Sequence, residues 1–192
     1  MERFKVTIKG VSPLLMHSCR DANPLEPMAK EIKKLTSKRN KTDEDLLKIM
    51  ELEYRINAYY DENLGFYING EMVEAAIING AKANKNGKKT KIAITVEEEK
   101  IQLIHKGSND IDELYQNEEF KDVRFVVVNR SKIMRCRPRF NQWGLEFHVS
   151  LNNEVMDSDD LIKAIDVAGK EHGIGDYRPR YGRFEALTEQ IN

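Results

Sequence analysis

The sequence has little cysteine and no long apolar run. Its 192 residues include two cysteines, Cys19 and Cys136, and neither has the spacing or the neighbouring histidines of a zinc site. We therefore expect two reduced thiols. No stretch has the length and apolarity of a membrane-spanning helix. The first ten residues alternate like a strand, whereas a signal peptide needs an apolar core. These absences favour a cytoplasmic protein that does not enter a membrane.

Signals for metal, cofactor and nucleotide chemistry are also missing. No Gly-Lys-Ser/Thr sequence is present, which argues against nucleoside triphosphate hydrolysis. The histidines are scattered, and no pair has the i, i+4 spacing of a helical zinc site. The acids Asp157, Asp159 and Asp160 are better explained as residues at the start of a helix, where they complement its dipole. We expect neither a metal nor a cofactor.

The net charge is small, but the charges are segregated. The formal charge is −1, from 31 basic and 32 acidic residues. Acidic residues gather in four segments, 43–45, 97–99, 110–119 and 157–160. Basic residues gather in three others, which contain Lys82, Lys85, Lys88, Lys89 and Lys91, then Arg130, Lys132, Arg135, Arg137 and Arg139, then Arg178, Arg180 and Arg183. This pattern permits one basic face on a neutral molecule.

Hydrophobic periodicity predicts a single α+β domain over residues 1–192. Residues 3–9 alternate as a half-buried strand, and residues 24–61 have the spacing of two helices, the second starting with a capping box at Thr42 and Asp45. A further strand and turn precede a helix over 71–83. We expect the polar stretch 84–89 to be a mobile loop or hairpin tip.

The second half of the chain predicts several strands and one helix. The segment RFVVV, residues 124–128, contains a continuous apolar run after its arginine and favours a central strand, and residues 145–151 alternate again. Residues 158–173 predict a helix with Ser158 as its N-cap and Gly173 as its stop, followed by a last strand. Strands at both ends, with a late helix between them, favour an antiparallel sheet covered by helices on one face, with a helical insertion at about 24–61.

Three segments resemble hallmarks of the RAMP superfamily, the RRM-like RNA-binding proteins that form backbone and processing subunits of CRISPR complexes. The segment KGVSPLLMHS is similar to the opening strand and its Ser-Pro-Leu turn. The segment YINGEMVEAAIINGAK resembles an Ile-Pro-Gly turn and the following helix, with Asn69 in place of the proline. The segment GIGDYRPRYGRFE resembles the glycine-rich loop after the last helix, which supports bound RNA. The resemblance implies an RRM-like, ferredoxin-like fold and a chain that polymerises along nucleic acid.

A second resemblance covers most of the chain and concerns its origin. The segments KKLTSKRNKTDEDLLKIMELEY, AAIINGAKANKNGKK, IMRCRPRFNQW and GIGDYRPRYGRF are similar to a family of small bacteriophage and prophage proteins that are usually left without an assigned function. The resemblance implies a phage-encoded protein that would work in the cytoplasm of a bacterial host. It implies little chemistry.

The arginines of segment 131–144 form the first candidate binding site. In an extended chain Arg135, Arg137 and Arg139 share one face and can follow successive phosphates. Phe140 and Trp143 come next and are candidates for stacking on bases. The alternative is an edge strand whose arginines pair with acids and whose Trp143 belongs to the core.

The loop 173–183 forms the second candidate binding site. It combines glycines that let the backbone approach a ligand, arginines that bind phosphate and aromatic rings that stack; the candidates are Gly173, Gly175, Tyr177, Arg178, Arg180, Tyr181, Gly182 and Arg183. Alternatively, these arginines bridge to Asp176 and Glu185 in a structural turn. Surface ion pairs contribute only about 0 to 1 kcal/mol each, which favours the ligand-binding interpretation.

Two further groups complete the candidate residues. Lys85, Lys88 and Lys89 would add charge and salt dependence rather than specificity, or would simply keep the protein in solution. His17 follows the first strand, where a general base of a metal-independent RAMP-type endoribonuclease could sit. A lone histidine after a turn is more often structural.

Together these features predict a phage-type protein that binds single-stranded RNA or DNA largely without sequence readout and forms a homo-oligomer or filament. One alternative is the endoribonuclease that uses His17. The other is a phage assembly or anti-host protein whose basic face binds an acidic protein partner.

Overall fold

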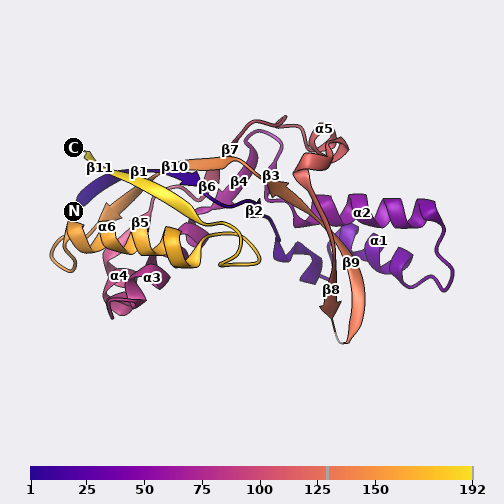
Figure 1. Ribbon diagram of the computed structural model, residues 1–192, viewed down its shortest axis with the longest axis horizontal. Coiled ribbons are helices and arrows are strands. Elements are labelled where there is room, and N and C mark those ends of the chain that lie inside the picture. Colours follow the sequence, from indigo (N-terminus) through magenta and orange to yellow (C-terminus); the bar gives the residue numbers. More distant parts are fainter. Residues whose placement is uncertain (129, 192) are drawn as a thin grey trace.

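The first and last strands of the chain lie side by side in one antiparallel sheet (Figure 1). The computed structural model describes residues 1–128 and 130–191. In it, β1 (Glu2–Gly10) pairs with β11 (Phe184–Ile191) on one side and β10 (Trp143–Leu151) on the other. Strand β10 also pairs with β5 (Ile94–Val96) and β7 (Ile104–His105).

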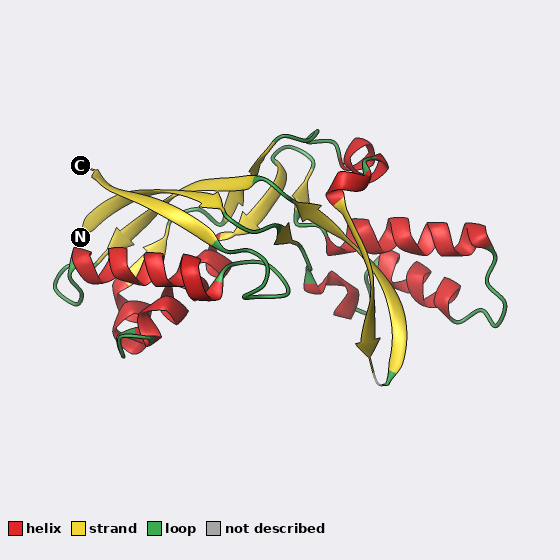
Figure 2. Ribbon diagram, viewed as in Figure 1, coloured by secondary structure: helices red, strands yellow, loops and turns green. Residues whose placement is uncertain are grey.

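Two helices cover one face of this sheet, as the sequence predicted. Helix α3 (Gly70–Lys82) packs against α6 (Ser158–Val167) and the π-helical turn η3 (Ala168–His172) that continues it (Figure 2). The helices approach closely, since a Cβ on Gly80 would lie 2.2 Å from the main-chain oxygen of Ala164. In chain order, α3 comes between β1 and β5, and α6 comes between β10 and β11. Together with the strand order β11-β1-β10-β5 in the sheet, this is the arrangement of a ferredoxin-like βαββαβ unit. The α+β class with an antiparallel sheet is thereby confirmed.

Two long insertions into this unit build a second lobe. The first runs from β1 to α3 and contains β2 (Leu14–Leu15), η1 (Cys19–Ala22), α1 (Pro27–Thr36), α2 (Asp43–Asn57), β3 (Tyr60–Asp61) and β4 (Gly65–Asn69). The second runs from β5 to β10 and contains β6 (Lys100–Gln102), β7, α5 (Ile111–Gln116), η2 (Glu118–Phe120), β8 (Lys121–Val128) and β9 (Ser131–Phe140). The predicted helices of 24–61 are present, with both hydrogen bonds of the capping box at Thr42.

Helix α2 takes the place of a strand at one edge of β9. The Glu53 carboxylate accepts a hydrogen bond from the Cys136 amide at 2.9 Å, and the Asn57 side-chain amide donates to the Cys136 carbonyl at 3.5 Å. Both helix side chains are buried. Since buried backbone groups need partners, these two residues allow β9 to run beside a helix. Strand β9 pairs with β2 on this edge only at its end, and with β8 along its other edge.

Three local predictions were wrong. Residues 124–128 lie in β8, which is an edge strand of the order β2-β9-β8 and not a central strand, and its apolar run faces solvent on one side. The lysine-rich stretch leads into helix α4 (Gly87–Ala93), where the Thr90 hydroxyl donates to the Asn86 carbonyl at 3.0 Å, so it is no hairpin tip. The N-cap of α6 is Asp157, one residue before the predicted Ser158.

Within residues 1–128 and 130–191, every helix is too short or too polar to cross a bilayer.

Candidate nucleic-acid interface

The loop 173–183 folds back on itself and is held by its own backbone. Gly173, Gly175 and Gly182 have φ values of 72°, 80° and 74°, a region that favours glycine. The Ile174 amide donates to the Gly182 carbonyl at 2.9 Å. A Cβ on Gly182 would lie 1.7 Å from the Ile174 oxygen. The glycines therefore serve the turn, and the loop has one defined shape.

The same loop is joined to the segment that follows β1. The Asp176 amide donates to the Leu15 carbonyl, and the Gly182 amide to the Pro13 carbonyl, both at 2.8 Å. Ile174 is buried in the core. These contacts hold the loop where the two lobes meet, while its tip stays in solvent.

Three arginines of the loop are exposed and have no acidic partner in the described parts of the chain. Arg178, Arg180 and Arg183 are all exposed, and none forms an ion pair there. The predicted alternative, a bridge from these arginines to Asp176, does not form because Asp176 pairs with Arg137 at 2.6 Å. The charges of the loop tip therefore face water.

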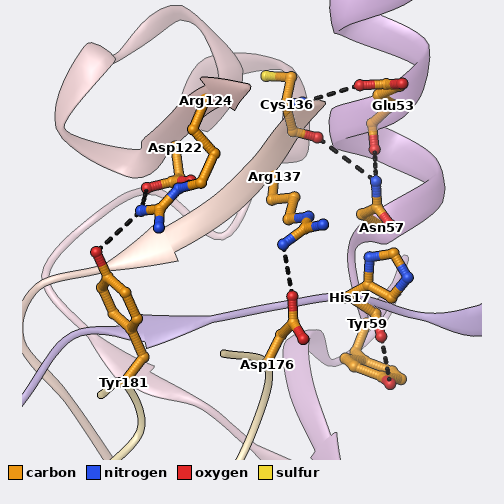
Figure 3. Close-up of polar contacts among 10 residues, drawn as sticks. All are labelled: His17, Glu53, Asn57, Tyr59, Asp122, Arg124, Cys136, Arg137, Asp176 and Tyr181. Carbon is orange, nitrogen blue, oxygen red and sulfur yellow. Dashed lines mark hydrogen bonds and ion pairs between the residues drawn. The ribbon is translucent and has the colours of Figure 1, made fainter. Parts of the chain in front are cut away.

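Arg124 of β8 contacts both tyrosines of the loop, and Figure 3 shows its guanidinium beside Tyr181 and Asp122. Its Cζ is 5.2 Å from the ring centroid of Tyr177 and 5.1 Å from that of Tyr181, and its Nη2 donates to the Tyr181 hydroxyl at 2.9 Å. The hydrogen bonds to Asp122 raise the pKa of Arg124 above its ordinary value. This cation joins the hairpin to the loop. Sequence reasoning missed it, because Arg124 lies in an apolar run far from the loop in the chain.

The arginines of β9 are placed differently from those of the loop. They do alternate on one face of a strand, as predicted. Arg135, however, pairs with Glu53 at 2.6 Å, and Arg137, which is only 7% exposed, pairs with Asp176. Arg139 is half-buried, and its Nε atom is buried with no hydrogen-bond partner among the described residues. The strand arginines therefore hold the fold together and do not present a row of free charges.

The two aromatic residues predicted to stack on bases belong to the core. Phe140 is 0% exposed and meets the rings of Phe66, His105 and Phe120. Trp143 donates through Nε1 to the Ser12 carbonyl at 2.8 Å and covers Gly10. Their burial leaves no ring face for a base. The exposed loop ring is Tyr177, at 51%.

The predicted lysines are exposed but lie away from the loop. Lys85, Lys88 and Lys89 flank the turn between α3 and α4. This turn is fixed near the start of α6 by a hydrogen bond of 3.3 Å between Asn86 and Asp160. The loop begins at the other end of α6 and η3, about 20 Å away at the helical rise of about 1.5 Å per residue. The lysines and the loop therefore form two separate basic areas.

His17 lies inside the junction of the lobes. Its main-chain oxygen accepts a hydrogen bond from the Tyr59 hydroxyl at 3.1 Å (Figure 3). The Nδ1 atom of its ring is buried and has no partner in residues 1–128 and 130–191. A bound strand would not reach this atom without a change in structure. Among the same residues, no three His, Cys, Asp or Glu side chains are arranged to hold a metal ion.

A hollow of about 600 Å³ lies beside the exposed loop. It is lined by Asn79, Glu171, His172, Asp176, Tyr177, Arg178 and Pro179. A second, larger groove of about 810 Å³ lies between α1, α2 and β9. The hollow brings a tyrosine ring and an arginine to one concave surface, which is an arrangement suited to a nucleotide unit.

The open face of the sheet lacks what an RRM uses for RNA. Its outward side chains form ion pairs, Arg3 of β1 with Glu97 just after β5 at 2.7 Å and Lys5 of β1 with Glu146 of β10 at 3.0 Å. The outward positions of β1 and β10 carry no Phe, Tyr or Trp, and the ring that is present there, His148, is held by the Glu98 carboxylate at 2.7 Å. The open face of the sheet therefore lacks the stacking platform of an RRM, whereas the loop exposes the ring of Tyr177.

Comparison with protein-family models and with curated proteins gives no match.

Proposed function

We propose that the protein binds single-stranded nucleic acid through the loop 173–183, largely without reading its sequence. The observation that carries the proposal is a set of exposed arginines with no acidic partner among the described residues, Arg178 and Arg180 at the loop tip and Arg183 at its base, together with a half-exposed Tyr177. Guanidinium groups match the geometry of phosphate oxygens, and a tyrosine ring stacks on any base.

The rigidity of the loop supports this function. Its shape is set by the turn glycines and by backbone hydrogen bonds to Pro13 and Leu15. Binding then costs little ordering of the backbone, so more of the contact energy remains as affinity. Stacking on Tyr177 needs unpaired bases, which favours single strands over duplexes. The distant lysines would add salt-dependent attraction to a longer strand.

The test is fluorescence anisotropy with labelled single-stranded RNA and DNA of about 20 to 40 nucleotides across a salt series. For single strands the slope of log affinity against log salt is about −0.7 per phosphate contact. The double variant Arg178→Ala, Arg180→Ala should flatten that slope by about one unit or more and lower the affinity at least about tenfold. The ratio of RNA to DNA affinity then identifies the ligand.

The matched control is Arg3→Ala with Lys5→Ala, which removes the same charge from the open face of the sheet. Because these residues pair with Glu97 and Glu146, their loss should leave the slope unchanged. The proposal is wrong if the natural sequence does not bind at low salt, or if the two double variants lose affinity equally. Incubating labelled RNA with the protein in EDTA tests the nuclease alternative on the same samples.

A further inference from the structure

The hairpin of β8 and β9 exposes an apolar stripe. Val123, Phe125 and Val127 alternate along β8 and are 43%, 71% and 71% exposed. Alternate residues of a strand share a face, so the three side chains form one row. Exposed apolar rows of this kind are rare on monomers and often mark an interaction surface.

The stripe lies on the face of the hairpin that the loop does not use. Arg124, between Val123 and Phe125, projects to the other face and meets Tyr177 and Tyr181. Directly across from Phe125 on β9 is Met134, which is half-buried. The nucleic-acid interface and the stripe therefore occupy opposite faces of one ribbon.

The outer edge of β8 is also open. The strand pairs with β9 along one edge, and from Val123 to Val127 its backbone has no hydrogen-bond partner on the other edge among the described residues. An edge strand with free amides and carbonyls is a template for another strand. The apolar side chains supply burial, and the edge supplies hydrogen bonds.

The order of residues in β8 is complementary to itself. The outward residues read Val, Phe, Val in both directions. When two such strands run antiparallel with Phe125 at the centre, Phe125 lies opposite Phe125 of the second copy, and each Val123 lies opposite Val127. Each Arg124 lies opposite Val126, so no like charges meet between residues 123 and 127, where directly opposed like charges would be unfavourable.

We propose that two copies of this chain associate through antiparallel pairing of their β8 strands, centred on Phe125. Such a dimer has two-fold symmetry, because the same patch is used by both copies. It leaves the Arg124 face and the loop 173–183 of each copy free. The inference does not depend on the proposed function, and it adds avidity for a strand long enough to reach both loops.

The first experiment measures mass without nucleic acid, by light scattering at concentrations up to about 100 µM, because dimers depend on protein concentration. The natural sequence should have twice the chain mass of 22.3 kDa, and Phe125→Asp should have the mass of one chain. Leu187→Asp is the matched control, since Leu187 is equally an exposed apolar residue on an edge strand, β11. This control should remain dimeric.

The second experiment fixes the register. In a Cys19→Ser background, Phe125→Cys should form a disulfide between copies under mild oxidation, because directly opposed residues have suitable Cα separations. Val127→Cys alone should not, because it lies opposite Val123 of the second copy. Circular dichroism checks that each variant is folded.

The proposal is overturned if the natural sequence is a monomer at the highest concentration, or if Phe125→Asp remains dimeric. Equal crosslinking of the two cysteine variants also overturns it, because the register would then be wrong. Loss of oligonucleotide affinity in Phe125→Asp, with no change in mass, would assign the ring to base stacking instead. The mass and crosslinking outcomes are independent of whether Arg178 and Arg180 bind nucleic acid.

Discussion

The protein has two arginine-rich segments, and they differ in what their charges meet. In β9, Arg135 forms an ion pair with Glu53, and Arg137 forms one with Asp176. In the loop, the side chains of Arg178 and Arg180 are exposed to solvent. Both segments contain three arginines, so the number of arginines does not identify a binding surface. The decisive quantity is whether an acid lies within reach in the fold.

The arginines of β9 and those of the loop serve two different purposes. A buried arginine held by a carboxylate fixes the position of a strand, and removing either partner leaves a buried charge uncompensated. An exposed arginine on a rigid loop contributes little to folding and is available to a phosphate. We therefore expect changes in β9 to act on stability and changes in the loop to act on binding.

The largest effect should come from Glu53→Ala. Glu53 is 3% exposed and bonds both Arg135 and the Cys136 amide. Its loss leaves both donors unpaired, so urea unfolding followed by circular dichroism should show a loss of about 3 kcal/mol. Glu51→Ala, on the same helix with surface partners, should cost less than about 1 kcal/mol. Equal losses would mean that the β9 pairs do not hold the strand.

A smaller effect, measured as affinity for nucleic acid, should follow from Asp176→Asn. This change leaves the buried Arg137 without its carboxylate partner, which should also cost stability, and it removes one negative charge beside the loop. Since the charge balance at the interface becomes more positive, affinity for a single-stranded oligonucleotide at low salt should rise by about two- to fivefold. Glu189→Gln makes the same change in net charge on β11 and is the control. A rise in both variants would reflect net charge alone.

The smallest effect concerns the two thiols. Burial, together with the nearby Glu53 carboxylate, raises the pKa of Cys136 to about 12, while Cys19 is exposed. Because the thiolate is the reactive form, Cys136 should stay protonated and unmodified by an alkylating reagent at pH 9, whereas the exposed Cys19 is accessible to the same reagent. Peptide mass spectrometry reads both sites. Fast labelling of Cys136 would show that β9 is not tightly packed against α2.

Features set by local chemistry were predictable from the sequence. The capping box at Thr42 depends on a residue three positions away, and the stop of the last helix depends on Gly173 alone. The period of two in β1 and β10 followed from burial on one face, and both strands were found. These elements were enough to predict the α+β class.

Features set by contacts between distant residues were not predictable. Continuous apolar residues are typical of a central strand, but β8 leaves the body of the protein with β9 and keeps one face bare. Arg137 is neutralised by a residue 39 positions away. Phe140 follows the arginines in sequence, yet its ring completes an aromatic cluster from three other segments. The candidate loop was found, but its partner Arg124 was not.

The position of β1 between β10 and β11 has a consequence for synthesis on the ribosome. Both of its neighbours are encoded near the end of the chain. At about 5–20 residues per second, β1 waits on the order of ten seconds before either neighbour emerges. During that time Phe4, Val6 and Ile8 have no sheet to enter. The nascent chain therefore carries an unpaired apolar strand, and the loop 173–183 is released just before β11 closes the sheet.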